Sequence, residues 1–285
     1  MKVAVLSGKG GTGKTLVSVN LAAVASTATY LDCDIEAPNG HLFFKPDITS
    51  KNEVAVEIAN VDNSLCNGCR KCIEFCRFNA LSYVNNQLLV FEDLCHSCGG
   101  CMLVCPEKAL SKKNKVVGEL VSGYSEKVEV KSGFLKLGEA SGNAIISELI
   151  KDDIHSDSLT IIDCPPGSSC SVMESIRDVD YCVLVAESTI FGLHNLKMVV
   201  DLVKIFNKPF GVVLNKTFDE DNPVESYCLS NNIEILTKIK FDQELGRINS
   251  NGNIAVRENL RYKELFENLL TKIVRGVDNE TTVNP

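Results

Sequence analysis

Two features that many proteins have are missing from this 285-residue chain, and their absence excludes whole classes of protein. No stretch approaches the roughly 18 uninterrupted apolar residues that a membrane-spanning helix needs. The first apolar run, Lys2 to Leu6, is too short for the core of a secretory signal peptide. We therefore expect a cytoplasmic protein without stable membrane insertion.

Basic residues are also in short supply. Lysine and arginine number 29 against 37 aspartate and glutamate residues, so the formal net charge is −8. The one dense group of lysines, Lys112, Lys113 and Lys115, is most simply a solvated turn and is smaller than the basic patch that nucleic-acid binding requires. We expect no nucleic-acid partner.

Cysteine, by contrast, is abundant and regularly spaced. Eight of the 13 cysteines form two runs with the spacing Cys-x2-Cys-x2-Cys-x3-Cys, which are Cys66, Cys69, Cys72 and Cys76, then Cys95, Cys98, Cys101 and Cys105. In a cytoplasmic protein such spacing indicates metal or cluster ligands rather than disulfides. It is the spacing with which bacterial-type ferredoxins hold two [4Fe–4S] clusters.

In that pattern the fourth cysteine of each run ligates the cluster of the other run. The two predicted ligand sets are therefore Cys66, Cys69, Cys72 and Cys105, and Cys95, Cys98, Cys101 and Cys76. Pro106 follows the second run as the ferredoxin pattern requires, whereas Arg77 follows the first. Zinc binding, or cysteines kept as small buried hydrophobic residues, is the alternative interpretation.

The runs belong to an internal repeat of period 29, from Cys66 to Cys95. Two similar halves predict a small α+β ferredoxin-like domain with pseudo-two-fold symmetry, inserted at residues 60–117. On either side, residues 1–59 and 118–285 alternate short apolar strands with helical segments, a pattern typical of an α/β fold with a mostly parallel sheet and helices on both faces. A closing amphipathic helix is expected over residues 261–274.

A glycine-rich loop stands between the first strand and the first helix, which is the context of a phosphate-binding loop. Its residues are Gly8, Lys9, Gly10, Gly11, Thr12, Gly13, Lys14 and Thr15. The glycines let backbone N–H groups approach phosphate oxygens at the positive end of the helix dipole. In such a loop Lys14 would contact the β- and γ-phosphates of ATP, and Thr15 would ligate Mg²⁺.

Because it carries a second lysine, Lys9, the loop resembles the deviant Walker A motif of the MinD/ParA/Mrp group of P-loop ATPases, which includes the nitrogenase iron protein. The resemblance implies that Lys9 crosses a dimer interface to the partner's nucleotide. It also implies that Asp34 orients the attacking water and that Asp163 holds Mg²⁺ as the Walker B acid. The Gly167 N–H would sense the γ-phosphate, and Asn215 would hydrogen-bond adenine.

Together with the cysteine domain, the match resembles the iron–sulfur branch of MinD-type ATPases. It implies Mg²⁺-dependent ATP hydrolysis coupled to electron transfer through two [4Fe–4S] clusters to a redox partner protein. The active form would be a homodimer or a heterodimer with a related ATPase subunit. The alternatives are an iron–sulfur cluster scaffold or carrier of Mrp type and a MinD-like regulatory ATPase with redox sensing. A scaffold would need a Cys-x2-Cys pair outside the two runs, and the sequence has none.

Two further residues have weaker interpretations. Cys170 stands seven residues after Asp163, as a cluster ligand does in the nitrogenase iron protein, but the earlier loop at 138–142 offers no second cysteine. We interpret Cys170 as a loop thiol, with ligation as the alternative. His96 lies between two predicted ligands, where a hydrogen bond would tune a cluster potential, although an exposed histidine is the simpler expectation.

Overall fold

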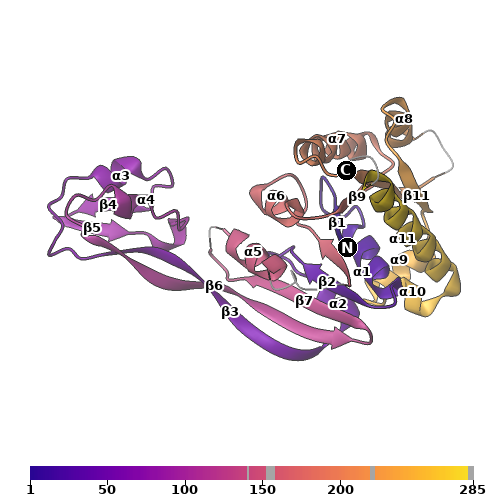
Figure 1. Cartoon of the computed structure of the whole chain (residues 1–285), viewed down its shortest axis with the longest axis horizontal. Coiled ribbons are helices and arrows are strands. Elements are labelled where there is room, and N and C mark those ends of the chain that lie inside the picture. Colours follow the sequence, from indigo (N-terminus) through magenta and orange to yellow (C-terminus); the bar gives the residue numbers. More distant parts are fainter. Residues whose placement is uncertain (140, 152–157, 219–221, 282–285) are drawn as a thin grey trace.

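The computed structural model describes residues 1–139, 141–151, 158–218 and 222–281. Within these ranges nine strands form one sheet in the order β11-β10-β9-β1-β8-β2-β7-β6-β3 (Figure 1). Seven of them pair in parallel, namely β1 (Lys2–Leu6), β2 (Ala28–Asp32), β7 (Val128–Leu135), β8 (Leu159–Asp163), β9 (Tyr181–Glu187), β10 (Phe210–Thr217) and β11 (Ile235–Lys240). The mostly parallel α/β sheet predicted from the sequence is confirmed.

Helices cover both faces of this sheet because successive strand residues point to opposite sides. Ala4 and Leu6 of β1 belong to one hydrophobic core, whereas Val3 and Val5 belong to the other. The first core is closed by α5 (Asn143–Lys151), α6 (Cys170–Ile176), α7 (Ile190–Ile205) and α8 (Pro223–Ser230). The second is closed by α1 (Lys14–Val24), α2 (Gly40–Phe44), α9 (Gln243–Ser250), α10 (Ala255–Glu258) and α11 (Leu260–Thr281).

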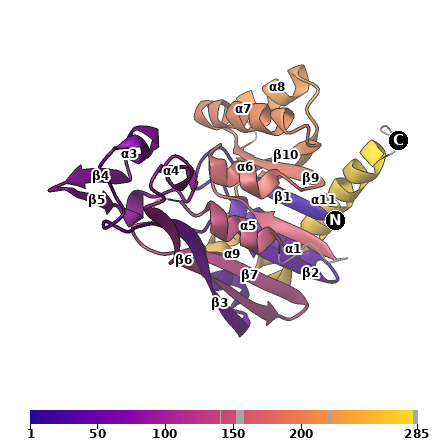
Figure 2. The same cartoon turned by 60° about the vertical axis from the view of Figure 1, so that its left-hand side comes forward.

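The remaining two strands of the sheet are long and antiparallel. β3 (Asp47–Val61) pairs with β6 (Leu110–Ser125) from Asp47 opposite Tyr124 to Val61 opposite Leu110. Only part of this ribbon lies beside β7, and the rest extends away from the sheet (Figures 1 and 2). Asp62 N–H donates to the Ala109 carbonyl at 2.8 Å, so the two chain segments are still paired where the ribbon ends.

The ribbon carries a small lobe at its far end, which we call the cysteine lobe (residues 62–109). It contains α3 (Lys71–Phe75), β4 (Leu81–Val84), β5 (Gln87–Val90), a short 3-10 helix (Glu92–Leu94) and α4 (Gly100–Leu103). Its own core includes two cysteines, Cys72 and Cys101, with Leu81 and Leu88. β3 and β6 run unbroken through residues 60 and 117, so the limits of the inserted domain at those positions stay a prediction.

Two local expectations from the sequence are wrong. Lys112, Lys113 and Lys115 form part of β6 rather than a turn, because their segment pairs with β3 along the ribbon. The closing helix also extends beyond Val274, to Thr281. Among the helices in the described ranges, none combines the length and the apolar composition that crossing a bilayer requires.

Candidate functional site

The glycine-rich loop links the end of β1 to the start of α1, at the carboxyl edge of the parallel sheet. Gly13 has φ of 94°, and a Cβ atom there would lie 2.1 Å from Asn215 Nδ2. Only glycine fits this position without strain. The same Asn215 Nδ2 donates to the Thr12 carbonyl at 2.7 Å. β10 therefore holds the loop in place through the side chain at its carboxyl end.

A cavity of about 630 Å³, partly open to solvent, lies over this loop. Its lining includes residues that the sequence motif predicts, which are Gly10, Gly11, Gly13, Lys14, Thr15 and Asp34. It also includes Asn39, Phe43 and Asn249, which no sequence motif indicates. Asn39 directly precedes α2, Phe43 lies in α2 and Asn249 lies in α9. The volume of this cavity includes open solvent, and the space that water-sized molecules can occupy is about 240 Å³.

Lys14 and Asp163 form the buried ion pair at the base of this cavity. Lys14 Nζ lies 2.5 Å from Asp163 Oδ1 and 3.8 Å from Asp34 Oδ2. Ser18 Oγ donates to the same Asp163 oxygen at 3.0 Å, and the Tyr30 hydroxyl donates to the other at 2.9 Å. Burial lowers the pKa of Lys14, but the Asp163 carboxylate outweighs it and holds the pKa above its ordinary value.

Asp32 is a buried carboxyl that the sequence motif did not single out. Burial and the nearby Asp163 charge raise its pKa to about 7. Hydrogen bonds from backbone N–H groups oppose this shift, because they stabilise the ionised carboxylate. Those donors are Asn39 N–H at 3.0 Å and Gly40 N–H at 2.8 Å. Asp32 thereby fixes the loop that follows β2. The pKa of Asp34 is also raised, chiefly by burial, although Lys14 opposes the shift.

Gly167 follows β8 with φ of 93°, and its N–H donates to the Ser7 carbonyl at 2.8 Å. Any contact of this N–H with a γ-phosphate requires that bond to break. Asn215 is likewise engaged, with its amide on the glycine-rich loop. The γ-phosphate role of Gly167 and the adenine role of Asn215 thus stay predictions.

Lys9 lies at the rim of the site and pairs within its own chain. Its Nζ is 2.6 Å from Glu187 Oε2 and 5.2 Å from the centre of the Phe191 ring. Lys216 Nζ contacts the other oxygen of Glu187 at 2.7 Å. Phe191 and its neighbour Ile190 are 61 % and 81 % exposed, so an apolar surface adjoins Lys9.

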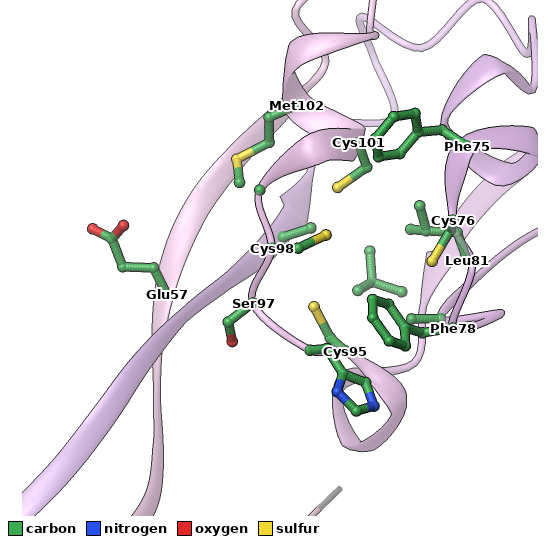
Figure 3. A pocket seen from close by; sticks show the side chains of 15 residues that line it. Glu57, Phe75, Cys76, Phe78, Leu81, Cys95, Ser97, Cys98, Cys101 and Met102 are labelled. Carbon is green, nitrogen blue, oxygen red and sulfur yellow. The ribbon is translucent and has the colours of Figure 1, made fainter. Parts of the chain in front are cut away.

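The cysteines converge on two cavities in the cysteine lobe. One is lined by Cys76, Cys95, Cys98 and Cys101, and Figure 3 shows their sulfur atoms around a common space bordered by Phe75, Phe78 and Leu81. The other is lined by Cys66, Cys69, Cys72 and Cys105, with Tyr83 and Leu88. The structure brings together the same two sets of four that the spacing predicts.

Each of these two cavities offers four thiol groups as donors. No three His, Cys, Asp or Glu side chains in the described parts of the chain stand close enough to share one metal ion. A cubane cluster binds one thiolate at each of four irons, so its ligands surround a volume rather than converge on a point.

Of the two weaker sequence candidates, Cys170 lies apart from these sets, whereas His96 lines the cavity of Cys76, Cys95, Cys98 and Cys101. Cys170 is exposed at the start of α6. His96 stacks on Phe78, with ring centres 3.9 Å apart and an angle of 16° between the planes. Cys33, Cys164, Cys182 and Cys228 are buried in the body of the protein, which is consistent with a packing role.

Comparisons with known proteins match most of the chain. The model of the CobQ/CobB/MinD/ParA nucleotide binding domain matches residues 3–256. The uncharacterized protein MJ0578 of Methanocaldococcus jannaschii is 31% identical over 281 residues, which cover 96% of each chain.

Solved structures of low sequence identity share the fold. The cell division ATPase MinD of Pyrococcus furiosus superposes with a TM-score of 0.60 at 19% identity, covering 96% of this chain and 98% of that one. MinD of Pyrococcus horikoshii, solved as a complex with Mg-ADP, gives 0.58 at 18% identity and covers 95% of each chain.

Proposed function

The chain belongs to the CobQ/CobB/MinD/ParA family of nucleotide-binding ATPases, and on that premise we propose a specific function. We propose that ATP binding and Mg²⁺-dependent hydrolysis at a dimer interface are coupled to electron transfer through two [4Fe–4S] clusters to a partner protein. The observation that carries this proposal is the pair of four-cysteine cavities on a chain that also holds a nucleotide cavity.

The nucleotide half of the proposal assigns a step to each buried group. Lys14 leaves Asp163 and contacts the β- and γ-phosphates, whose negative charge replaces the carboxylate as its partner. Asp163 is then free to hold Mg²⁺ through water, together with the Thr15 hydroxyl. Asp34, at the rim of the same cavity, orients the water that attacks the γ-phosphoryl group. ADP leaves with the bridging oxygen.

The dimer part of the proposal depends on Lys9. This lysine sits beside the exposed Ile190 and Phe191, which together offer an apolar surface that a second subunit would bury. When the dimer closes, Lys9 leaves Glu187 and contacts the phosphates of the nucleotide bound to the partner subunit. A homodimer and a heterodimer with a related ATPase subunit use the same geometry.

The electron-transfer half rests on the lobe. Cys66, Cys69, Cys72 and Cys105 would hold one cluster, and Cys95, Cys98, Cys101 and Cys76 the other. Each cluster supplies one-electron redox chemistry when bound. Cys69 and Cys98 lie at the exposed rims of their cavities, so both sites are accessible from the lobe surface. Apolar side chains such as Phe75 and Leu81 limit the access of water to the site of Cys95, Cys98, Cys101 and Cys76.

Anaerobic purification followed by metal analysis tests the proposal directly. Two four-iron clusters predict about eight irons and eight sulfides per chain. Potentiometric titration monitored by electron paramagnetic resonance, with and without Mg-ATP, then measures the coupling. A protein with bound clusters but with identical potentials in both conditions, and with no ATP-dependent reduction of any acceptor, would contradict it.

The MinD-like regulatory alternative makes a different prediction. MinD-type regulation acts at membranes, so ATP should drive the protein onto anionic liposomes in a sedimentation assay. Cosedimentation that depends on ATP, without ATP-dependent electron transfer, favours that function. A cluster scaffold would instead transfer its iron to an apo-protein, whereas clusters enclosed by four cysteines each should remain on this chain.

A further inference from the structure

One cation joins the cysteine lobe to the rest of the protein. Lys115 Nζ lies 2.8 Å from Asp93 Oδ1, in the 3-10 helix of the lobe, and 2.8 Å from Glu139 Oε2, in the segment before α5. The Lys115 and Glu139 side chains are only 14% and 9% exposed. Their attraction is therefore screened less than that of a surface pair. Carboxylates from two parts of the molecule share this ammonium group.

Four residues after Glu139 the chain enters α5, from which a series of contacts leads to the glycine-rich loop. Asn143, at the start of α5, accepts a hydrogen bond from Ser171 Oγ of α6 at 3.2 Å. One turn further along these helices, Ser147 donates to Glu174. α6 directly follows the segment that contains Gly167, whose N–H is bonded to the Ser7 carbonyl. A displacement of that segment on nucleotide binding therefore reaches α5 through side-chain hydrogen bonds.

From Asp93 the same series leads to one of the two cysteine cavities. Asp93 stands two residues before Cys95. A cleft separates the lobe from α5, with Cys95, His96 and Ser97 on one wall and Asn143 on the other. Cys95 and its neighbours line both this cleft and the cavity of Cys76, Cys98 and Cys101. The cysteines of the second cavity do not line the cleft.

We propose that Lys115 is a positioning residue that transmits the nucleotide state of the ATPase body to the cluster held by Cys95, Cys98, Cys101 and Cys76, and not to the other cluster. This inference rests on the proposed function. Lys115 Nζ contacts both Glu139 and Asp93 at 2.8 Å, so this one side chain links the two carboxylates. A shift of α5 therefore moves the loop that begins at Cys95 and changes the charges around that cluster. Its potential should respond to nucleotide, while that of the cluster at Cys66, Cys69, Cys72 and Cys105 stays constant.

The test compares variants of the anaerobically purified, full-length protein. Lys115→Met removes the shared cation, and Glu139→Gln weakens the bond to the ATPase body while Lys115 keeps Asp93. Lys113→Met is the matched control, since Lys113 Nζ lies 2.5 Å from Glu92 of the same 3-10 helix. Each protein is titrated potentiometrically with and without Mg-ATP, and paramagnetic resonance distinguishes the two clusters. Hydrogen exchange of the peptide over residues 92–101 gives a second readout.

In the wild-type protein we expect Mg-ATP to shift one potential and to change exchange in that peptide. Lys115→Met and Glu139→Gln should lose most of the potential shift and most of the change in exchange. Their ATP affinity should change less than twofold. Lys113→Met should keep both the potential shift and the change in exchange. Full responses in Lys115→Met and Glu139→Gln would overturn the role of Lys115 and leave the proposed function intact. Equal shifts of both clusters in the wild type would also overturn it. A wild type that binds ATP without any shift would reject the proposed coupling itself, and this inference with it.

Discussion

The ammonium group of Lys9 lies 2.6 Å from a carboxylate oxygen of Glu187 in the same chain. Burial raises the pKa of Glu187, but hydrogen bonds from Lys216 and Lys9 outweigh it and hold the pKa below its ordinary value. Glu187 is therefore ionised at neutral pH, and in the proposed dimer it would compete with the partner subunit's nucleotide for Lys9. The proposed dimer must overcome this contact each time that it forms.

Glu187→Gln should strengthen ATP-dependent dimerisation. A partly exposed ion pair contributes about 0.2–1 kcal/mol, which corresponds to a dimer dissociation constant lower by up to about fivefold. Analytical ultracentrifugation with a non-hydrolysable ATP analogue measures this constant. Glu225→Gln, which removes the ion pair between Glu225 of α8 and Lys238 of β11, serves as control and should change nothing. A weaker dimer in Glu187→Gln would show that this carboxylate supports the closed state.

Lys14→Met should destabilise the nucleotide-free protein, apart from its effect on ATP binding. The substitution leaves the fully buried Asp163 carboxylate without its cation, and breaking a buried pair in this way costs about 3–5 kcal/mol. Tyr30→Phe removes only one hydrogen bond to the same carboxylate and should cost about 1.5–3 kcal/mol. Chemical unfolding without nucleotide tests the order of the two variants. Equal stability of Lys14→Met and wild type would contradict a stabilising role for the Lys14–Asp163 pair.

Asp32 should make the protein less stable as the pH rises from about 5 to 7. Its folded pKa of about 7 exceeds the ordinary value of 3.8, so in this window the folded state holds a proton that the unfolded chain has released. The free energy of unfolding then falls with rising pH, by at most about 1.4 kcal/mol per pH unit. Thermal unfolding at pH 5.5 and 7.5 measures the effect. Asp32→Asn should flatten this dependence, whereas the exposed Asp201→Asn should preserve it.

Cys76→Ala should remove one cluster and spare the other. Cys76 is the last cysteine of the first run but lines the cavity of Cys95, Cys98 and Cys101. The iron content should fall from about eight to about four per chain. Cys170→Ala is the control and should retain the full iron content, since this exposed thiol lies outside both cavities. Complete iron loss in Cys76→Ala would mean instead that the lobe folds only with both clusters.

Local pattern was enough to predict the sheet and which cysteines line a common cavity. The central strands are buried on both faces and stand out as apolar runs, and cluster ligands are spaced by the geometry of the cluster itself. Strand β3 gave no such signal, because residues 47–53 are exposed and, apart from Ile48, polar. Contacts such as Lys115 with Glu139, or Lys9 with Glu187, join residues distant in sequence. Only the folded arrangement of α5, β6 and β9 specifies them.

The paired ends of the ribbon have an evolutionary consequence. Val61 and Leu110 face each other across β3 and β6, so the chain leaves for the cysteine lobe and returns at neighbouring points. A tight turn of a few residues could close the same strand pair without disturbing the sheet. An ancestral ATPase could therefore have acquired the lobe in a single insertion at a hairpin tip, and a descendant could lose it in a single deletion, with the nucleotide site left whole in either case.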